Sequence, residues 1–454
     1  QRVIEEISAD MKSGRRMARM LQGDVGSGKT IVALLAMLNV VEQVYQCAFM
    51  APTELIARQH YEVITALLSA LHPSISTVLL TGSIKGKERE AILTNIMSGD
   101  ASIVIGTHAL FQEKVIFRNL ALIVIDEQHR FGVAQRMALA SKGESSHILH
   151  LSATPIPRTL SMMLYGDMEC SLLKEKPADR KPIATRLIAR SRYEEVLSRL
   201  KAALDRGEKA YWICPLVEDN QMTRSPDEQN TSWSSGHPVI WSSDDIAAVK
   251  TRYSEFVARF GDIVSLVHGR MKADERNAEM QKFAEGRSKL LVATTVVEVG
   301  VDVRDATIIV IEQAERFGLA QLHQLRGRVG RGEKESGCVL LYSDEVMSHG
   351  ARGDSEAPVP NASSLLPRLG VLRDTEDGFR IAEEDLKWRG GGDLLGVRQS
   401  GSEPFIWFDI AQHASLLETV RDDARNLLEA DPELQGERGQ AARILLQLFE
   451  REVG

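Results

Sequence analysis

The sequence predicts an α/β protein with two parallel-sheet lobes in tandem, followed by a mainly helical C-terminal region. Three observations predict this fold: a glycine-rich loop that opens a helix near the start, short apolar runs that alternate with helix-length segments, and a second alternating series without such a loop. Strands separated by helix-length segments are typical of βαβ units, whose strands form a parallel sheet. Each lobe is therefore expected to contain its own sheet.

The predicted strands fall into two series. The first comprises residues 47–50, 77–80, 102–105, 121–125 and 147–151, and the second comprises residues 210–214, 263–267, 289–293, 307–311 and 338–342. A charged segment with two prolines, residues 174–182, separates the series and is typical of an interdomain linker. The polar stretches 218–237 and 346–366 are predicted from composition alone to be mobile loops.

These patterns predict the domain boundaries. The first lobe is expected to span residues 1–175, the linker 176–184, the second lobe 185–345, a variable polar segment 346–370 and the C-terminal region 371–454. The helical pattern of the last region has one apolar face, formed by Leu416, Leu417, Val420 and Leu427.

The bulk composition is ordinary for a globular protein. Of the 454 residues, 43% are hydrophobic and 26% are charged, and 55 basic against 63 acidic residues give a net charge of −8. This charge argues against indiscriminate polyanion binding but does not exclude a local basic groove. The sequence shows neither a bilayer-length apolar stretch nor a secretory signal, so we expect a cytoplasmic protein without a membrane partner.

The cysteines and histidines show no metal-ligand spacing. Cys47, Cys170, Cys214 and Cys338 are far apart and form no C-x-x-C pair, which fits a reducing cytosol and argues against structural zinc. The 11 histidines show no such pattern either. A lone histidine such as His60 or His268 is expected to be an ordinary packed or surface residue.

Residues 23–30 fit the phosphate-loop pattern G-x-x-x-x-G-K-[ST]. They are Gly23, Asp24, Val25, Gly26, Ser27, Gly28, Lys29 and Thr30. In such a loop the backbone N–H groups form a concavity for nucleotide phosphates, Lys29 contacts the β- and γ-phosphates, and Thr30 holds Mg²⁺. The alternative is a chance glycine-rich turn. The apolar residues that follow at helical spacing argue against it, because they place the loop at a helix N-terminus.

A pair of acids follows a buried strand. The wholly apolar run 121–125 is typical of a strand buried on both faces, and it leads into Asp126 and Glu127. Asp126 would reach the Mg²⁺ held by Thr30, and Glu127 would orient the attacking water, as phosphoryl transfer requires. The alternative is a solvated turn with two surface acids. The preceding strand and the upstream phosphate loop favour the catalytic interpretation.

Two arginines close the second series. Arg328 and Arg331 are three residues apart, so on a helix they would share one face. Facing the first lobe, they would act as arginine fingers on the γ-phosphate, an effect on the order of 10³–10⁵ in rate. The alternative is a basic patch that contacts phosphate backbone or only water. Because only one lobe has the phosphate loop, we expect the nucleotide to lie between the lobes.

The ordered set of motifs resembles superfamily 2 helicases, and more narrowly the RecG family of bacterial branched-DNA helicases. The set comprises residues 23–30, 51–55, 81–82, 106–108, 126–129, 152–154, 294–295 and 324–331. The most specific matches are residues 126–133, 153–160 and 315–332, and the likeness runs from residue 1 to about 401. The resemblance implies two RecA-like lobes and an ATP-dependent DNA helicase or translocase. It would act on replication forks and Holliday junctions in recombination and DNA repair.

The resemblance also implies roles for individual residues. Lys29 and Thr30 bind phosphate and Mg²⁺, Asp126 completes the metal site, and Glu127 is the general base. The residues that couple nucleotide state to lobe movement would be Gln128, His129, Ser152, Thr154 and Gln324, with Arg328 and Arg331 as the fingers. Residues 377–386 and 389–401 resemble a translocation element, a helical hairpin and loop shared with the transcription-repair coupling factor.

In that element, Arg389 and Gln399 match polar residues that matter for movement along duplex DNA. The implied cofactors are ATP and Mg²⁺. The implied partners are double-stranded and branched DNA and single-stranded DNA-binding protein, for a monomer in the bacterial cytoplasm at the nucleoid.

The chain departs from the family in three places. The N-terminal wedge domain that splits branched DNA is not matched, Gly391 stands where the family usually has proline, and the polar stretches 218–237 and 346–366 do not follow the family pattern closely. The first departure leaves two alternatives open. One is a duplex translocase of the transcription-repair coupling type, although that family usually has Phe at the position of Ser27 and Glu at that of Gln128. The other is a DNA-binding scaffold without autonomous unwinding, which the intact ATPase residues argue against.

Overall fold

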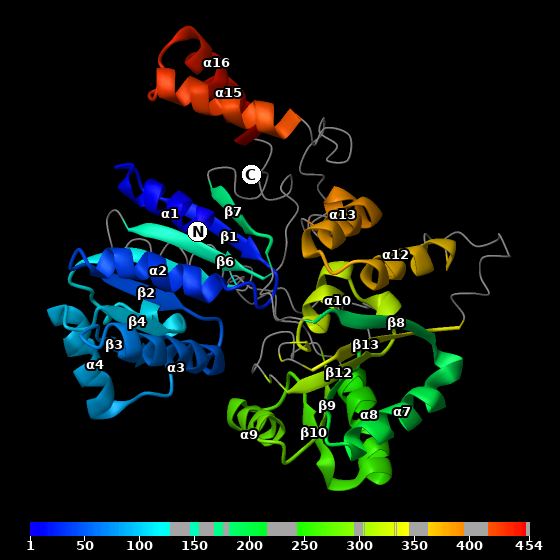
Figure 1. Ribbon diagram of the computed structural model, residues 1–454. Coiled ribbons are helices and arrows are strands. Elements are labelled where there is room, and N and C mark those ends of the chain that lie inside the picture. Colours follow the sequence, from blue (N-terminus) through cyan, green and yellow to red (C-terminus); the bar gives the residue numbers. More distant parts are fainter. Residues whose placement is uncertain are drawn as a thin grey trace, which may run out of the picture. The chain divides into compact units, whose positions relative to one another are not determined.

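The computed structural model describes residues 1–127, 146–153, 168–175, 181–215, 243–294, 303, 305–330, 332, 334–344, 362–394 and 416–450 (Figure 1). It divides into two compact units. The first comprises Gln1–Pro155 and Glu169–Ala382, and the second comprises Ile156–Met168 and Glu383–Gly454. Both parallel sheets belong to the first unit.

The first lobe is built on a sheet whose described strands run in the order β3-β4-β2-β5-β6-β1-β7. The strands are β1 (Ala18–Gly23), β2 (Gln46–Met50), β3 (Thr77–Leu80), β4 (Ile103–Gly106), β5 (Leu120–Asp126), β6 (His147–Ser152) and β7 (Glu169–Leu173). Every pair is parallel. All residues of β2 and β4 are buried, as expected for strands covered by helices on both faces.

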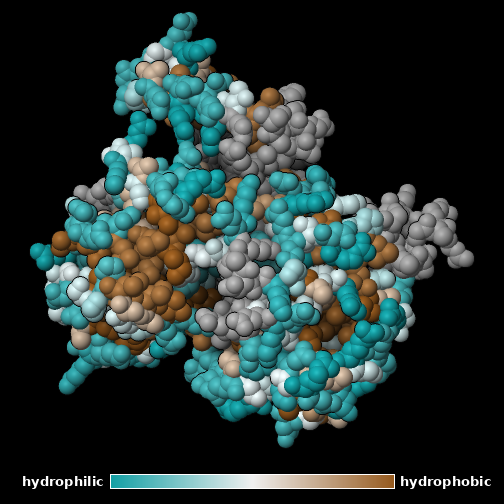
Figure 2. All heavy atoms as spheres, viewed as in Figure 1, coloured by the Kyte–Doolittle hydropathy of each residue, from teal (hydrophilic) through white to brown (hydrophobic). Residues whose placement is uncertain are grey.

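Alternate residues of these strands enter two separate cores. Phe49 and Val124 pack with helices α1 (Arg2–Lys12), α2 (Lys29–Val41) and α3 (Glu54–Leu71). Met50 and Ile123 face the opposite core, which includes Ile96 of α4 (Gly86–Ser98) and Leu110 of η1 (His108–Phe111). Figure 2 shows hydrophobic side chains on the outer surface of α2 and α3, where Ile31, Leu35 and Val63 are exposed.

The second lobe has a parallel sheet whose described strands follow the order β10-β11-β9-β12-β13-β8. The strands are β8 (Ile183–Ala189), β9 (Lys209–Ile213), β10 (Val264–Val267), β11 (Leu290–Ala293), β12 (Ala306–Ile311) and β13 (Ser336–Tyr342). Tyr211 and Ile213 pack toward α9 (Ala273–Ala284), α10 (Leu319–Arg326) and α12 (Ala362–Asp374). Trp212 packs toward α7 (Tyr193–Asp205) and α8 (Ser243–Phe260).

Each strand predicted from an apolar run is present, with ends that differ by two residues or fewer. Strands β1, β7 and β8 were not predicted. Strand β1 contains the buried polar residues Arg19 and Gln22, so it is not an apolar run. Arg19 is tolerated because its guanidinium donates to Asp10 Oδ2 at 2.7 Å and to Ser171 Oγ at 2.7 Å. Strand β8 begins at Ile183, inside the segment 176–184 expected to be a linker.

Helix α12 begins at Ala362, within the segment 346–366 predicted to be a loop. It contains Pro367, which disfavours a helix interior, but burial of the leucines that follow stabilises the helix despite the proline. Leu369 and Leu372 are buried in the core of the second lobe together with Ile381 of α13 (Gly378–Leu394). For this part of the segment the loop prediction is wrong.

The C-terminal unit contains the rest of α13 and the helices α15 (Leu416–Ala430) and α16 (Glu437–Glu450). The Asp431 carboxylate accepts hydrogen bonds from the backbone N–H groups of Gln435 and Gly436, which shape the turn between α15 and α16. Leu416 and Val420, which were expected on an apolar face, are exposed. Among the helices of the described ranges, none combines the length and the apolar run that crossing a bilayer requires.

Candidate functional site

The phosphate loop connects β1 to α2. Gly26 and Gly28 have φ values of 80° and 90°, a left-handed conformation that side chains other than glycine rarely adopt. Gly28 is the N-cap of α2, and no described side chain caps the first turn, so none of these side chains competes with an anion for the helix N-terminus. The prediction that the loop opens a helix is confirmed.

Lys29 is the first residue of α2, and its ammonium group lies over the loop. Its Nζ donates hydrogen bonds to the carbonyl oxygens of Gly23 at 2.7 Å and Asp24 at 2.9 Å. Ser27 Oγ is buried and has no hydrogen-bond partner among the described residues. A Cβ atom on Gly23 would lie 2.6 Å from Ser27 Oγ and 2.9 Å from Leu173 Cβ, so only glycine fits. A cation, helix N–H groups and an unpaired hydroxyl together fit nucleotide phosphates.

Three neighbouring strands bring the other residues of the first lobe to the same edge of the sheet. Asp126 of β5 pairs in register with Leu151 of β6, and Ser152 of β6 pairs with Gln22 of β1. Because parallel strands lie about 4.8 Å apart, Asp126 is two strand spacings, about 10 Å, from Leu21, two residues before the phosphate loop begins. Asp126, Ser152 and Gly23 therefore end their strands at one edge of the sheet, and the sequence predicted this position for Asp126.

Glu127 has a φ of 51°, which places a non-glycine residue in the left-handed region. Its backbone N–H donates to the carbonyl oxygen of Leu151 at 3.0 Å, which continues the pairing of β5 with β6 past Asp126. Holding a residue in this conformation costs about 1–3 kcal/mol of conformational free energy, and such residues occur preferentially at functional sites. The strain supports the prediction that Glu127 has a chemical role.

His60 of α3 contacts the predicted metal ligand. Its Nε2 lies 3.0 Å from Asp126 Oδ2, and the two side chains are only 16% and 14% exposed. The imidazole ring also packs on Phe49 of β2, with 4.6 Å between ring centroids. His60 is therefore packed, as expected, but its contact with Asp126 was not predicted. No spacing rule links residues 60 and 126, because the crossover from β2 through α3 brings them together.

The donor atoms at this edge fit Mg²⁺. Thr30 supplies a hydroxyl oxygen and Asp126 a carboxylate, and both are the hard oxygen ligands that Mg²⁺ prefers. In the described part of the chain, no group of three or more His, Cys, Asp or Glu side chains would hold a metal without help. An ion bound here would therefore need phosphate oxygens and water to complete its coordination.

A histidine of the second lobe reaches the phosphate loop. His323 of α10 places Nε2 3.1 Å from Asp24 Oδ1, and the side chains are 9% and 14% exposed. Because Arg326 Nη2 donates to His323 Nδ1 at 2.9 Å, the imidazole carries its proton on Nε2 and donates it to Asp24. His323 lies within the matched stretch 315–332, but no role was predicted for it, because the coupling motif was taken to begin at Gln324.

Arg326 extends this contact into α12. Its Nη1 donates to the backbone carbonyl oxygens of Leu372 and, at 3.1 Å, of Thr375. Burial lowers the pKa of the Arg326 guanidinium, and these carbonyl oxygens satisfy the donors that burial removes from water. A hydrogen-bonded chain thus runs from Asp24 through His323 and Arg326 to the C-terminal end of α12.

Helix α10 ends at Arg326, before Arg328. The expectation that Arg328 and Arg331 share one helix face is therefore wrong. Gly327 and Arg328 lie in a turn, and Gly330 has a φ of 72°, which a continuing helix does not allow. The turn lies beside the phosphate loop, because a Cβ atom on Gly327 would be 3.3 Å from Val25 Cβ.

Only some of the remaining predicted residues belong to the described part of the chain. Gln324 and Ser152 are buried. Gln128, His129, Thr154, Arg331 and Gln399 lie outside the described residues, and Arg389 belongs to α13 with its side chain outside them.

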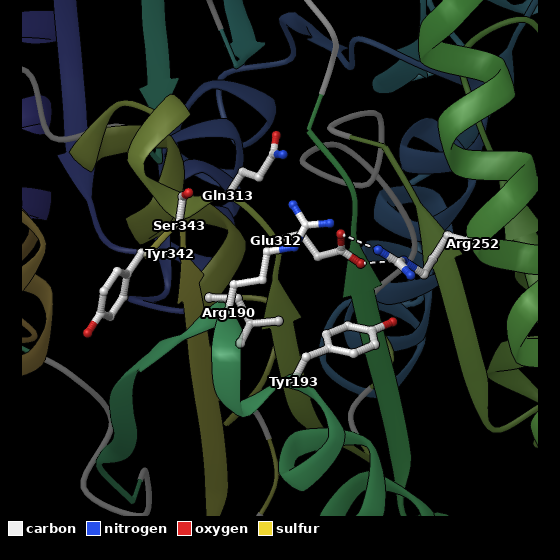
Figure 3. Close-up of a pocket in the computed structure, with 8 residues that line it drawn as sticks. Arg190, Tyr193, Arg252, Glu312, Gln313, Tyr342 and Ser343 are labelled. Carbon is white, nitrogen blue, oxygen red and sulfur yellow. Dashed lines mark hydrogen bonds and ion pairs between the residues drawn. The ribbon is translucent and has the colours of Figure 1, made fainter. Parts of the chain in front are cut away.

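A polar pocket in the second lobe lies at the ends of β12 and β13 (Figure 3). Arg252 contacts Glu312 through two hydrogen bonds, Nε to Oε1 at 2.6 Å and Nη2 to Oε2 at 2.9 Å. The guanidinium carbon of Arg252 lies 5.0 Å from the ring centroid of Tyr193. Burial alone would lower the pKa of Arg252, but hydrogen bonding to Glu312 outweighs this effect and raises it. The opposite charges of the two side chains neutralise each other, and we interpret the pair as a structural contact. None of the predicted site residues lines this pocket.

Three family models match the chain in order. They are DEAD/DEAH box helicase at residues 1–163, helicase conserved C-terminal domain at residues 228–333, and ATP-dependent DNA helicase RecG, domain 3, C-terminal, at residues 375–450. The ATP-dependent DNA helicase RecG of Streptococcus pneumoniae is 43% identical over 421 residues, which cover 93% of this chain and 57% of that protein. Its counterpart from Staphylococcus aureus is 42% identical over 428 residues, covering 94% and 57%.

Solved structures agree with these relatives. A structure of RecG bound to a three-way DNA junction matches with a TM-score of 0.70 and 38% identity, over 92% of this chain and 49% of that chain. Saccharomyces cerevisiae Dbp5 bound to RNA and ADP BeF3 matches with a TM-score of 0.54 at 17% identity, over 82% and 87% of the two chains, which shows the helicase fold alone. The chain spans 57% of the length of the two curated relatives. With both predicted parallel-sheet lobes confirmed, the chain belongs to the RecG family of ATP-dependent DNA helicases.

Proposed function

We propose that the chain is an ATP-driven DNA helicase or translocase that acts on branched DNA, namely replication forks and Holliday junctions, in recombination and DNA repair. The observation that carries the proposal is the contact between Asp24 of the phosphate loop and His323 of the second lobe. It joins the loop that holds phosphates to the lobe that would sense them. The relatives, which are longer, are named ATP-dependent DNA helicases, and one was solved on a three-way DNA junction.

In the proposed reaction, ATP binds with its phosphates on the loop and the positive end of α2. Lys29 leaves the carbonyl oxygens of Gly23 and Asp24 and neutralises charge on the β- and γ-phosphates. Glu127 accepts the proton of the attacking water and orients it. Mg²⁺, held by Thr30 and Asp126, would supply further neutralisation of the phosphate charge.

Arg328 and Arg331 are proposed to complete the site from the second lobe as arginine fingers. Gln128, His129, Ser152, Thr154 and Gln324 are proposed to couple the nucleotide state to movement of the lobes. The buried positions of Ser152 and Gln324 and the chain from Asp24 to Arg326 support this assignment.

The C-terminal region from residue 371 is proposed to pass this movement to duplex DNA, with Arg389 and Gln399 as the contacting residues. The match of residues 375–450 to the RecG domain 3 model supports it. We also propose the domain boundaries given above, a monomeric state, single-stranded DNA-binding protein as a further partner, and a cytoplasmic location at the bacterial nucleoid.

The proposal is tested by measuring ATP hydrolysis and unwinding side by side on a three-way junction and on linear duplex DNA. We expect the junction to stimulate hydrolysis, and we expect Glu127→Gln to bind ATP but not to hydrolyse it. The matched control is Glu88→Gln, which alters an exposed glutamate of α4. Equal hydrolysis with and without DNA, or full activity in Glu127→Gln, would contradict the proposal. Hydrolysis without unwinding would favour a translocase.

A further inference from the structure

We propose that His60 is a positioning residue that fixes the Asp126 carboxylate in the orientation needed to bind Mg²⁺ with a nucleotide. The inference rests on the proposed function, because it assumes that the first lobe binds a magnesium–nucleotide complex. It assigns a role to a residue outside every motif that the sequence singled out.

The contact has the geometry of a directed hydrogen bond. His60 Nε2 lies 3.0 Å from Asp126 Oδ2, and the carboxylate accepts, so the imidazole donates from Nε2. No other hydrogen bond to the Asp126 side chain occurs among the described residues. One oxygen is therefore held by His60, and Oδ1 is left for a metal ion or its bound water.

The elements around His60 hold the ring rigidly. Ala57 and Ile64, three residues before and four residues after it, are fully buried and fix this face of α3. Phe49, also fully buried, packs against the imidazole with 4.6 Å between ring centroids. Phe49 pairs in register with Val124 of β5, two residues before Asp126. Helix and sheet thus present the imidazole to the end of β5 in one orientation.

Without such a contact, the carboxylate of an aspartate at a strand end can adopt several rotamers. A hydrogen bond to one oxygen selects one orientation before the metal arrives, so less ordering remains to be done on binding. Hydrogen-bond partners of metal ligands typically contribute 10–100-fold to metal affinity. The effect of His60 should therefore appear in the Mg²⁺-dependent part of nucleotide binding.

Two substitutions separate positioning from packing. His60→Phe keeps an aromatic ring against Phe49 but removes the donor. His60→Gln loses the ring but places an amide N–H near the position of Nε2. If His60 acts only by packing, His60→Phe should keep the Mg²⁺-dependent nucleotide affinity and His60→Gln should lose it. If His60 positions Asp126, His60→Gln should keep this affinity and His60→Phe should lose it.

The measurement is the equilibrium affinity of the full chain for fluorescently labelled ADP, with Mg²⁺ and with a chelator. We expect His60→Phe to lose about 10–100-fold of the Mg²⁺-dependent affinity, to bind normally in chelator, and to be rescued by His60→Gln. An unchanged Mg²⁺ dependence in His60→Phe would overturn the inference, as would equal losses with and without Mg²⁺.

Two further arms guard against ambiguous outcomes. In the Asp126→Asn background, His60→Phe should have no additional effect, and an undiminished effect there would also overturn the inference. If His60→Phe does not fold, His60→Asn, whose shorter amide does not reach Asp126, takes its place with the same expected loss. If the unaltered chain binds no nucleotide at all, the proposed function fails. Normal binding with an unaffected His60→Phe variant would remove only the positioning role.

Discussion

His323 Nε2 and Asp24 Oδ1 lie 3.1 Å apart, although the two residues are separated by 299 positions in the sequence. Asp24 belongs to the predicted phosphate loop, and His323 belongs to α10 of the other lobe. Both side chains are largely buried, so the hydrogen bond to the carboxylate is worth about 1.5–3 kcal/mol. We therefore expect a change in this loop on nucleotide binding to reach α10 through the contact between His323 and Asp24.

We predict that His323→Ala uncouples hydrolysis from DNA without removing nucleotide binding. Losing a contact of this size lowers DNA-stimulated turnover by about tenfold or more, because about 1.4 kcal/mol corresponds to a factor of ten. The affinity for ADP should change little, because the groups proposed to hold its phosphates, the phosphate loop and Lys29, belong to the first lobe. Stimulated turnover and labelled-ADP affinity are measured in parallel, with the exposed His72→Ala as the control. Identical turnover in the two variants would rule out a coupling role for His323.

A second prediction concerns pH and His147. Burial and the neighbouring Arg16 lower the pKa of His147, while Asp10 opposes this, and Met17 N–H donates to the neutral Nδ1 at 3.0 Å. A histidine whose folded pKa lies below its unfolded value contributes stability that is fully present above the unfolded pKa and is lost as the pH falls. The first lobe should therefore become less stable between about pH 7.5 and pH 5.5.

The measurement is chemical denaturation at both pH values, compared with His147→Asn, whose amide oxygen lies near the position of Nδ1 and can accept the same hydrogen bond without titrating. The variant should lose less stability on acidification than the unaltered chain. An identical pH response in the two proteins would show that His147 does not contribute.

A third prediction tests whether α12 is part of the second lobe. Leu372 is 1% exposed in the same core as Tyr211 and Ile381, so Leu372→Ala should destabilise the lobe by about 2–5 kcal/mol. The control is Arg373→Ala at the next position, which removes only an exposed ion pair with Asp374 and should change the stability little. Denaturant unfolding measures both variants. Equal small losses would mean that α12 does not belong to this core.

The sequence predicted the sheets well wherever strands are wholly apolar, as in β2 and β5. It missed β1 because Arg19 and Gln22 interrupt the apolar pattern, and one of the hydrogen bonds that make the burial of Arg19 tolerable comes from Ser171, 152 positions away. It missed the start of α12 because Pro367 and the polar residues around it disfavour a helix, whereas burial of Leu369 and Leu372 stabilises one.

In the site, local motifs predicted the phosphate loop and the strand end at Asp126, because a loop and the helix that follows it are adjacent in sequence. The contacts of His60 and His323 were not predictable in this way. They join residues 66 and 299 positions apart, and only the folded sheets bring these residues together. The position of Arg328 was mispredicted for a similar reason. Its spacing from Arg331 suggested that both lie on one helix, but α10 ends at Arg326, two residues before Arg328.

Phosphates bound by the first lobe are proposed to be contacted by arginines of the second lobe. Steady-state ATP hydrolysis on a three-way DNA junction tests this contact most directly. We expect Lys29→Ala to abolish nucleotide binding and stimulated turnover together. Arg331→Ala should retain nucleotide binding but lose stimulated turnover by a factor on the order of 10³ or more. The exposed Lys201→Ala should behave like the unaltered chain. Unchanged stimulated turnover in both Lys29→Ala and Arg331→Ala would contradict the account.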